Sequence, residues 1–279
     1  MKNILIPTDF SENSWNAIEY ALNFFEQHSC NFYLLHVNTI SSLITNDVGY
    51  APTQDIIEET LVKPSKVQLK KVLKRISTLP LKANHRFFTL TDYNFFIESI
   101  RKHVGEKNID LIVIGTKGAT GLKKLIIGSN AASVITRVQC TTLVVPENAT
   151  FVKPKEIAFP TDFSTFYSSG LLNPVLRILD LIKASIRVLH INKRDYKLND
   201  DQQRNKAYLE DFFSHHNHSF HFLTNKDIEA AIQCFVESRD IDLIVMVAKN
   251  LNYFQRILFN PLVEEITYHT DIPFLVLHE

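Results

Sequence analysis

The hydrophobic pattern of the chain alternates between short apolar runs and longer amphipathic segments. Residues 4–6, 109–114 and 142–145 are rich in branched apolar side chains, which is typical of strands buried on both faces of a parallel sheet. Between such runs, apolar residues recur every three or four positions and predict amphipathic helices. The clearest sets are Trp15, Ile18, Leu22 and Phe25, and then Leu171, Val175, Ile178 and Ile182. Strands that alternate with helices predict βαβ units.

The same pattern occurs twice along the chain. The segment ILIPTDFS at residues 4–11 returns as IAFPTDFS at 157–164, and IDLIV at residues 109–113 returns at 241–245. A repeat of this length is a whole domain rather than a solenoid unit. The first copy carries about twenty additional residues within 39–81, beginning with a polar loop.

We therefore predict an α/β fold with two tandem domains, residues 1–149 and 154–279, joined by a linker at 146–154. Each domain is expected to be a five-stranded parallel sheet with helices on both faces and a crevice at the carboxyl ends of the strands. Ser11 and Ser164 are the predicted N-caps of the first helix in each copy. Pro174 is predicted to kink or break that helix in the second copy.

Composition and charge exclude several classes of function. The 279 residues are 45% hydrophobic and 22% charged, as in soluble globular proteins, and the formal net charge of zero lacks the basic footprint of a nucleic-acid binder. No apolar run is long enough for a membrane span, and the N-terminus shows no signal-peptide pattern. Three scattered cysteines argue for reduced thiols. We expect a cytoplasmic protein with no nucleic-acid or membrane partner.

The candidate chemistry lies in a glycine-rich segment that follows the strand at 109–114. Four of the seven glycines fall between Gly115 and Gly128, and Gly128-Ser129 opens a predicted helix. Glycines at the end of a strand let the backbone approach a ligand closely, and a helix N-terminus presents N–H groups to an anion. The segment therefore predicts a phosphate cradle, with a loop hinge and helix cap as the alternative interpretation.

The spacing G-x2-G-x9-G-S, from Gly115 through Gly118 to Gly128-Ser129, resembles the ATP-binding motif of the universal stress protein family. The resemblance covers nearly the whole chain, as two family domains in tandem. It implies an adenine nucleotide alpha hydrolase-like, Rossmann-like fold and ATP, with or without Mg²⁺, as the ligand. The family is associated with survival under stress.

The resemblance also implies roles for individual residues. Asp9 matches an acidic residue beside the ribose that can help to hold a metal, Val37 matches the position whose backbone meets the adenine edge, and Gly115 and Gly118 match the glycines that admit the phosphates. The nucleotide-binding set is Pro7, Thr8, Asp9, Val37, Gly115, Gly118, Gly128, Ser129 and Asn130. We assign no catalytic residue and no metal site.

Asp9 has an equally good alternative interpretation as a carboxylate that initiates the helix near Ser11. The second copy keeps the equivalent Asp162 although it lacks the glycine motif. His36 and His190 also recur in both copies and are interpreted as structural. At the motif positions the second copy has Val247, Asn250, Asn260 and Pro261, so that half is expected to have lost nucleotide binding.

The resulting hypothesis is an ATP-binding sensor or adaptor of the stress response, with the nucleotide in the N-terminal domain. The alternatives are a slow ATP hydrolase or nucleotidyl-transferring enzyme of the same fold, and a scaffold without a nucleotide. We expect no enzyme, because no candidate base or arginine finger is evident. The two domains are expected to form an intramolecular pseudo-dimer through their last strands, with further homodimerisation as an option.

Overall fold

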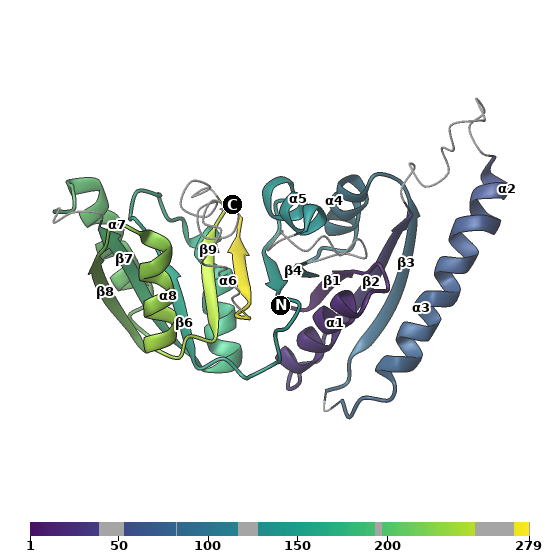
Figure 1. The fold of residues 1–279 in the computed structure, drawn as a ribbon, viewed down its shortest axis with the longest axis horizontal. Helices are drawn as coiled ribbons and strands as arrows, with labels where there is room; N and C mark the ends of the chain where they lie inside the picture. The colour runs from purple at the N-terminus through teal and green to yellow at the C-terminus, as the bar shows by residue number, and fades with distance from the viewer. Residues whose placement is uncertain (39–52, 82, 117–127, 193–196, 249–270, 279) are drawn as a thin grey trace. The chain divides into compact units, whose positions relative to one another are not determined.

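The computed structural model describes residues 1–38, 53–81, 83–116, 128–192, 197–248 and 271–278 (Figure 1). These residues divide into two compact units, of which the first ends at Glu147 and the second begins at Asn148. Residues 146–155, between the last strand of one unit and the first strand of the next, contain no helix or strand. Each unit is described by itself below.

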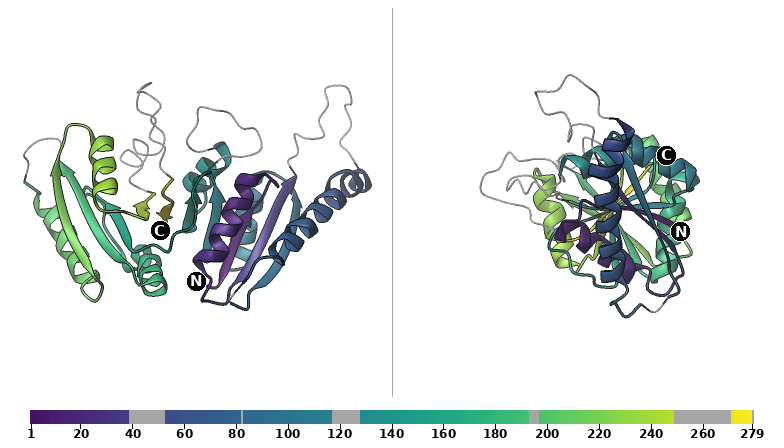
Figure 2. Two further views of the ribbon diagram at one scale, coloured as in Figure 1. Left: turned by 60° about the horizontal axis from the view of Figure 1, so that its bottom comes forward. Right: turned by 90° about the vertical axis from the view of Figure 1, so that its right-hand side faces the viewer.

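The first unit is a parallel sheet of five strands in the order β3-β2-β1-β4-β5. The connections fix the layers: α1 and α3 lie along one face of this sheet, and α4 and α5 pack together on the other (Figure 2). Its elements are β1 (Asn3–Pro7), α1 (Glu12–Phe24), β2 (Asn31–Asn38), α2 (Gln54–Ile57), η2 (Glu58–Val62), α3 (Lys63–Ile76), β3 (Arg86–Tyr93), α4 (Phe96–Glu106), β4 (Leu111–Gly115), α5 (Ser129–Arg137) and β5 (Thr142–Val145).

The second unit repeats this order, with its strands arranged as β8-β7-β6-β9-β10 and all parallel. The predicted α/β fold, with five parallel strands in each half, is therefore confirmed. The elements are β6 (Glu156–Pro160), α6 (Ser169–Ile182), β7 (Ser185–Asn192), α7 (Asp200–Phe212), β8 (His218–Thr224), α8 (Ile228–Ser238), β9 (Leu243–Val247) and β10 (Phe274–Leu277).

The same carboxylate contact ties the amino ends of two strands together in each unit. Asp110, just before β4, accepts hydrogen bonds from the backbone N–H groups of Lys2 (2.7 Å) and Asn3 (3.0 Å) at the start of β1. Asp242 accepts the equivalent bonds from Lys155 (2.7 Å) and Glu156 (3.1 Å). The repeated Ile-Asp-Leu motif thus encodes a fixed point of the sheet, at the edge opposite to the carboxyl ends of the strands.

The first helix of each unit buries the predicted apolar face, but the two helices begin differently. Ser11 is the N-cap of α1, as predicted, and its hydroxyl accepts the N–H of Ser14 at 3.2 Å. The prediction for Ser164 is wrong, because the N-cap of α6 is Ser168. The helix starts one turn later because Tyr167 lies in the core instead.

Two further predictions about helices change in the structure. Pro174 does not break α6, which runs through it from Ser169 to Ile182. The additional segment of the first unit contains α2 and η2, which lead into α3, while the polar loop predicted at its start lies outside the described residues. None of the helices in the described ranges has the length and apolar character that a membrane crossing requires.

Candidate functional site

The candidate site is built where the carboxyl ends of β1 and β4 meet the first turns of α1 and α5. β1 and β4 are neighbours, with Leu5 opposite Ile112, so the chain after Pro7 and the chain after Gly115 leave the sheet at the same edge. The N–H of Thr8 continues the ladder beyond β1 by donating to the carbonyl oxygen of Leu35 at 2.8 Å. The sheet therefore fixes the backbone of the site.

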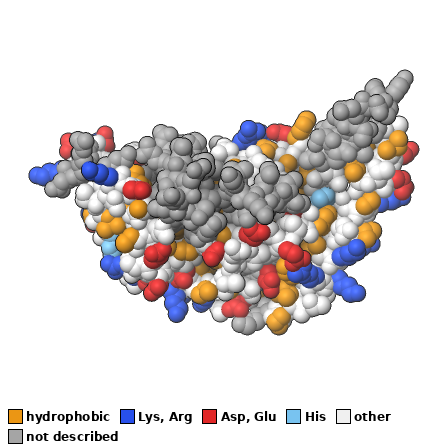
Figure 3. Space-filling view, viewed as in Figure 1, with side chains coloured by type: hydrophobic (Ala, Val, Ile, Leu, Met, Phe, Trp, Pro, Cys, Tyr) orange, Lys and Arg blue, Asp and Glu red, His pale blue; other side chains and the backbone are white. Residues whose placement is uncertain are grey.

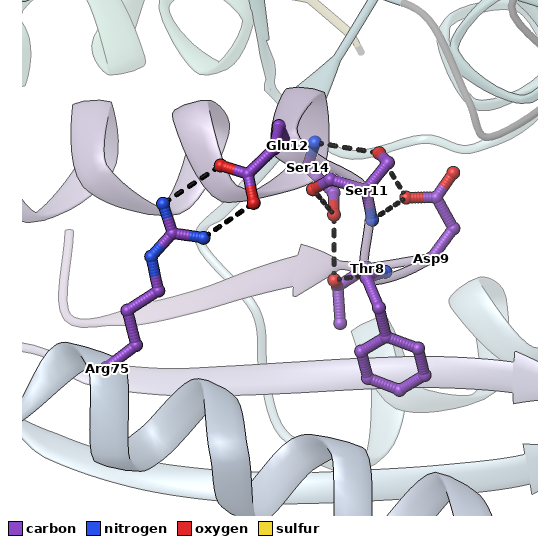
Figure 4. Close-up of polar contacts among 7 residues, drawn as sticks. Thr8, Asp9, Ser11, Glu12, Ser14 and Arg75 are labelled. Atoms are coloured by element: carbon purple, nitrogen blue, oxygen red, sulfur yellow. Dashed lines mark hydrogen bonds and ion pairs between the residues drawn. The ribbon is translucent and has the colours of Figure 1, made fainter.

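The Asp9 side chain folds back onto the start of α1. Its Oδ1 accepts the backbone N–H of Ser11 at 3.0 Å and the Ser11 hydroxyl at 2.6 Å (Figure 4). In the second unit Asp162 makes the same two contacts with Ser164, at 2.9 and 2.7 Å. Asp9 thus performs the helix-initiating role in this structure, and its contact with a ribose stays a prediction.

His36 positions the loop that follows β1. Its Nδ1 lies 2.8 Å from the carbonyl oxygen of Thr8, and its ring stacks on Phe10, with the ring centroids 4.3 Å apart. Phe10 has a φ of 67°, a left-handed conformation that is strained for a bulky residue. Since His190 makes the same contact with the carbonyl oxygen of Thr161 at 2.9 Å, the structural interpretation of the two histidines is confirmed.

Gly115 lies against the first turn of α1. A Cβ atom built on Gly115 would be 2.8 Å from Nδ2 of Asn13, closer than real Cβ contacts occur. A side chain at position 115 would therefore force the Asn13 side chain or the backbone to move, whatever ligand binds nearby. Val37 is half-buried near the end of β2, opposite Asp92 of β3.

Gly128 fixes the start of α5 next to the end of β4. Its N–H donates to the carbonyl oxygen of Thr116, and its own carbonyl oxygen accepts the N–H of Ala132 at 3.0 Å. Gly128 is the N-cap, so no side chain there accepts a bond from the first turn of α5, which contains the exposed Ser129 and Asn130. First-turn N–H groups lack partners inside the helix. These N–H groups, with the Ser129 hydroxyl, fit a phosphate. The remaining motif glycine, Gly118, lies outside the described residues.

An additional aromatic side chain lies at the equivalent edge of the second unit. Phe163 stacks on His190, with centroids 5.0 Å apart, and also lies beside Phe222, at 6.2 Å. Phe222 is opposite His190 in the sheet, whereas His36 is opposite Thr91. Val247, at the position of Gly115, is buried. The other three departures, Asn250, Asn260 and Pro261, lie outside the described residues.

Arg75 is a charged residue close to this loop that sequence reasoning missed. From α3 its guanidinium reaches both oxygens of Glu12, at 2.8 and 2.9 Å, and lies 3.9 Å above the Trp15 ring. The hydrogen bond from Arg75 lowers the pKa of the Glu12 carboxyl. No sequence signal pointed to this pair, because it joins residues far apart in the chain. Within the described ranges, no group of three or more His, Cys, Asp or Glu side chains could hold a metal.

Comparison with known proteins identifies the family of this fold and motif. The model of the universal stress protein family matches residues 1–146. The chain belongs to the universal stress protein family. Universal stress protein MJ0531 of Methanocaldococcus jannaschii is 32% identical over 144 residues, which are 52% of this chain and 81% of that protein. Universal stress protein YxiE of Bacillus subtilis is 26% identical over 145 residues, which are 51% of this chain and 97% of that protein.

Solved universal stress proteins also share the fold over the full length of the chain. The crystal structure of a universal stress protein from Archaeoglobus fulgidus aligns with a TM-score of 0.67 and 16% identity, covering 98% of this chain and 97% of that one. At this level of identity the likeness concerns the fold alone. The family assignment and the tandem fold expected from the sequence are therefore confirmed.

Proposed function

We propose that the N-terminal unit binds an adenine nucleotide, with ATP as its ligand, and that the protein acts as a stress-response sensor or adaptor. The observation that carries this proposal is the bond from Gly128 to Thr116, which brings the uncapped first turn of α5 against the end of β4. Such a turn offers backbone N–H groups and the positive end of the helix dipole to phosphate.

Different residues around this turn would bind different parts of the nucleotide. The first turn of α5, with the Ser129 hydroxyl, would bind the phosphates, and the backbone near Val37 would meet the adenine. Asp9 would meet the ribose with the part of its carboxylate that does not bind Ser11. A Mg²⁺ ion, if present, would screen the triphosphate charge. The protein would then bind the phosphates through backbone N–H groups rather than through a cluster of positively charged side chains.

We propose binding without efficient turnover. Neither the loop after β1 nor the first turn of α5 presents a His, Lys or Arg side chain among the described residues that could serve as a base or an arginine finger. Asp9 is the one carboxylate in the predicted nucleotide set, and it is engaged by Ser11. A bound nucleotide that is not consumed can report its own concentration, which suits a sensor.

Two measurements test the proposal. Native mass spectrometry of freshly purified protein should reveal a mass increase equal to one adenine nucleotide, and calorimetric titration with ATP, ADP and AMP should rank the three ligands. A time course with ATP should leave the nucleotide unhydrolysed over the duration of the titration. An empty protein that binds none of the three would support the scaffold alternative instead, and steady release of ADP would support the enzyme.

A further inference from the structure

A cavity lies between α1 and α3 of the first unit, on the inner side of the loop that follows β1. Its volume is about 150 Å³, and its walls include Phe10, Ser14, Trp15, Lys71 and Arg75. Of the residues predicted to bind nucleotide, Thr8 alone among the described ones lines it. The cavity therefore lies away from the β4 and α5 part of the candidate nucleotide site and, among the described residues, meets the predicted nucleotide set at Thr8.

The second unit has a much larger side chain at the position that corresponds to Ser14. Ser14 aligns with Tyr167, and the hydroxyl of each is hydrogen-bonded to the threonine that follows the first strand, Thr8 at 2.9 Å or Thr161. Tyr167 is one of the largest fully buried side chains, so the second unit buries an aromatic ring where the first unit has only a serine.

In the second unit, helix α7 is also hydrogen-bonded to the loop that follows β6. Gln202 of α7 donates to the carbonyl oxygen of Asp162 at 2.8 Å, and Asn205 donates to that of Phe163 at 2.8 Å. In the first unit α3 instead contacts the first turn of α1, through the bidentate contact of Arg75 with Glu12 at the surface. Tyr167 and the two α7 amides of the second unit thus take the place of Ser14 and the Arg75 contact of the first unit.

The inner wall of the cavity suits an apolar body. The Thr8 and Ser14 hydroxyls satisfy each other, and the Ser14 hydroxyl also donates to the Ser11 carbonyl oxygen at 2.9 Å, so the polar groups do not require a ligand. The apolar part of the lining is formed by Phe10, Trp15, Ile18 and Val72, and Gln68 of α3 adds an amide. A cavity of about 150 Å³ is large enough for one benzene ring.

The rim of the cavity is positively charged. Lys71 and Arg75 line it, and none of the described residues that line it carries a carboxylate. Both belong to α3, which has six basic residues and no acidic one, and whose Lys and Arg side chains lie at the right-hand side of Figure 3. An anionic group at the mouth would face the Lys71 ammonium and the Arg75 guanidinium, whose charge Glu12 already balances in part, while Arg75 keeps its place over Trp15.

We propose that this cavity binds a small aromatic carboxylate, with the ring against Trp15 and the carboxylate at Lys71 and Arg75. The proposal does not depend on nucleotide binding, because its ligand would contact side chains of α1 and α3 whereas the phosphates would contact α5. A small aromatic carboxylate would be a second class of ligand for this protein, in addition to a nucleotide.

The probe is benzoate, followed by the fluorescence of Trp15, the one tryptophan of the sequence. Benzoate should change the emission saturably with a dissociation constant on the order of 1 mM, as expected for so small a ligand. Benzamide, which has the same shape and no charge, should bind about tenfold more weakly. A linear change without saturation, or equal affinity for the two probes, would overturn the proposal.

Matched variants locate the binding. Lys71→Gln should weaken benzoate binding about threefold, whereas Lys70→Gln, its exposed neighbour outside the cavity, should leave it unchanged. Ser14→Tyr, which copies the second unit, should abolish the saturable change. If Ser14→Tyr does not fold, the two lysine variants decide: an equal effect of both, or none from Lys71→Gln, contradicts the assigned site.

Discussion

Gly115 at the end of β4 and Asn13 in the first turn of α1 are in such close contact that a Cβ atom at Gly115 would lie 2.8 Å from Asn13 Nδ2. The contact joins the two segments that flank the candidate site. It also means that a glycine of the nucleotide motif contributes to the packing of this unit. Its effects on binding must therefore be separated from its effects on stability.

Replacement of Gly115 by Ala should destabilise the protein by about 1–3 kcal/mol, because either the side chain of Asn13 or the backbone must move. The cost should fall by about 1 kcal/mol in an Asn13→Ala background, where the obstructing amide is gone. Urea unfolding of the two single variants and the double variant measures this coupling. Strictly additive effects would mean that the contact does not determine the residue at 115.

Replacement of Gly128 by Val should abolish nucleotide binding and leave the fold intact. The φ and ψ of Gly128, −63° and 155°, are accessible to valine, so the new side chain meets the ligand rather than strained backbone. Calorimetry with ATP measures the loss, and circular dichroism checks the fold. Gly105→Ala is the control, because nothing lies within 4 Å of its added Cβ. Unchanged affinity in the valine variant would refute the phosphate cradle.

The full-length protein should bind one adenine nucleotide, not two. In the second unit Phe163, His190 and Phe222 form an aromatic cluster at the corresponding edge, and Val247 replaces the first motif glycine. The stoichiometry from calorimetric titration at a protein concentration well above the dissociation constant tests this asymmetry. Two equivalents per chain would contradict it.

Alkylation should distinguish the three cysteines at pH 8. Burial raises the pKa of Cys30 to about 11 and that of Cys140 to about 12, so almost no reactive thiolate exists at either. Cys234 is exposed on α8 and should react within minutes. Peptide mass spectrometry after brief iodoacetamide treatment should find label at Cys234 alone. Reaction at Cys30 and Cys140 should increase as the pH is raised towards their pKa values, and rapid labelling of either at pH 8 would contradict this assignment.

The predicted pseudo-dimer can be tested by crosslinking. β5 and β10 would each be an outer strand of an isolated unit, and short apolar strands in that position invite pairing. Cysteines introduced at Val144 and Val276, or one residue to either side, in a Cys234→Ser background should form a disulfide within single chains under dilute oxidation. If every pair stays unlinked, the two units do not associate through these strands.

The strands and the major helices could be predicted because their periodicity is local. The apolar faces set by Trp15 and Leu171 are buried as expected, and the strand at 109–114 appears as β4, shortened to Leu111–Gly115 because Asp110 turns to bind the chain before β1. The glycine motif led to the correct family. These features depend on residues close together in sequence.

The details that could not be predicted depend on tertiary contacts. The N-cap of α6 moved from Ser164 to Ser168 because Tyr167 is taken into the core, and a helix-start pattern does not include the volume behind it. Similarly, the pairing of Arg75 with Glu12 joins two helices whose packing no local pattern specifies. The difference between Ser14 and Tyr167 was visible in the repeat, and it could have indicated the cavity.

Asp110 and Asp242 hold the amino ends of the strands together in both units, by bonds to the starts of β1 and β6. The structural role of the sheet is thus separated from its ligand-binding role. One rim of each sheet is held by the same carboxylate contacts, while residues at the opposite rim differ: Gly115 and Thr91 of the first unit correspond to Val247 and Phe222 of the second. Substitutions at the carboxyl ends of the strands can therefore change which ligand is bound without unfolding the domain. A chain of this design can lose one site and acquire another while its architecture stays the same.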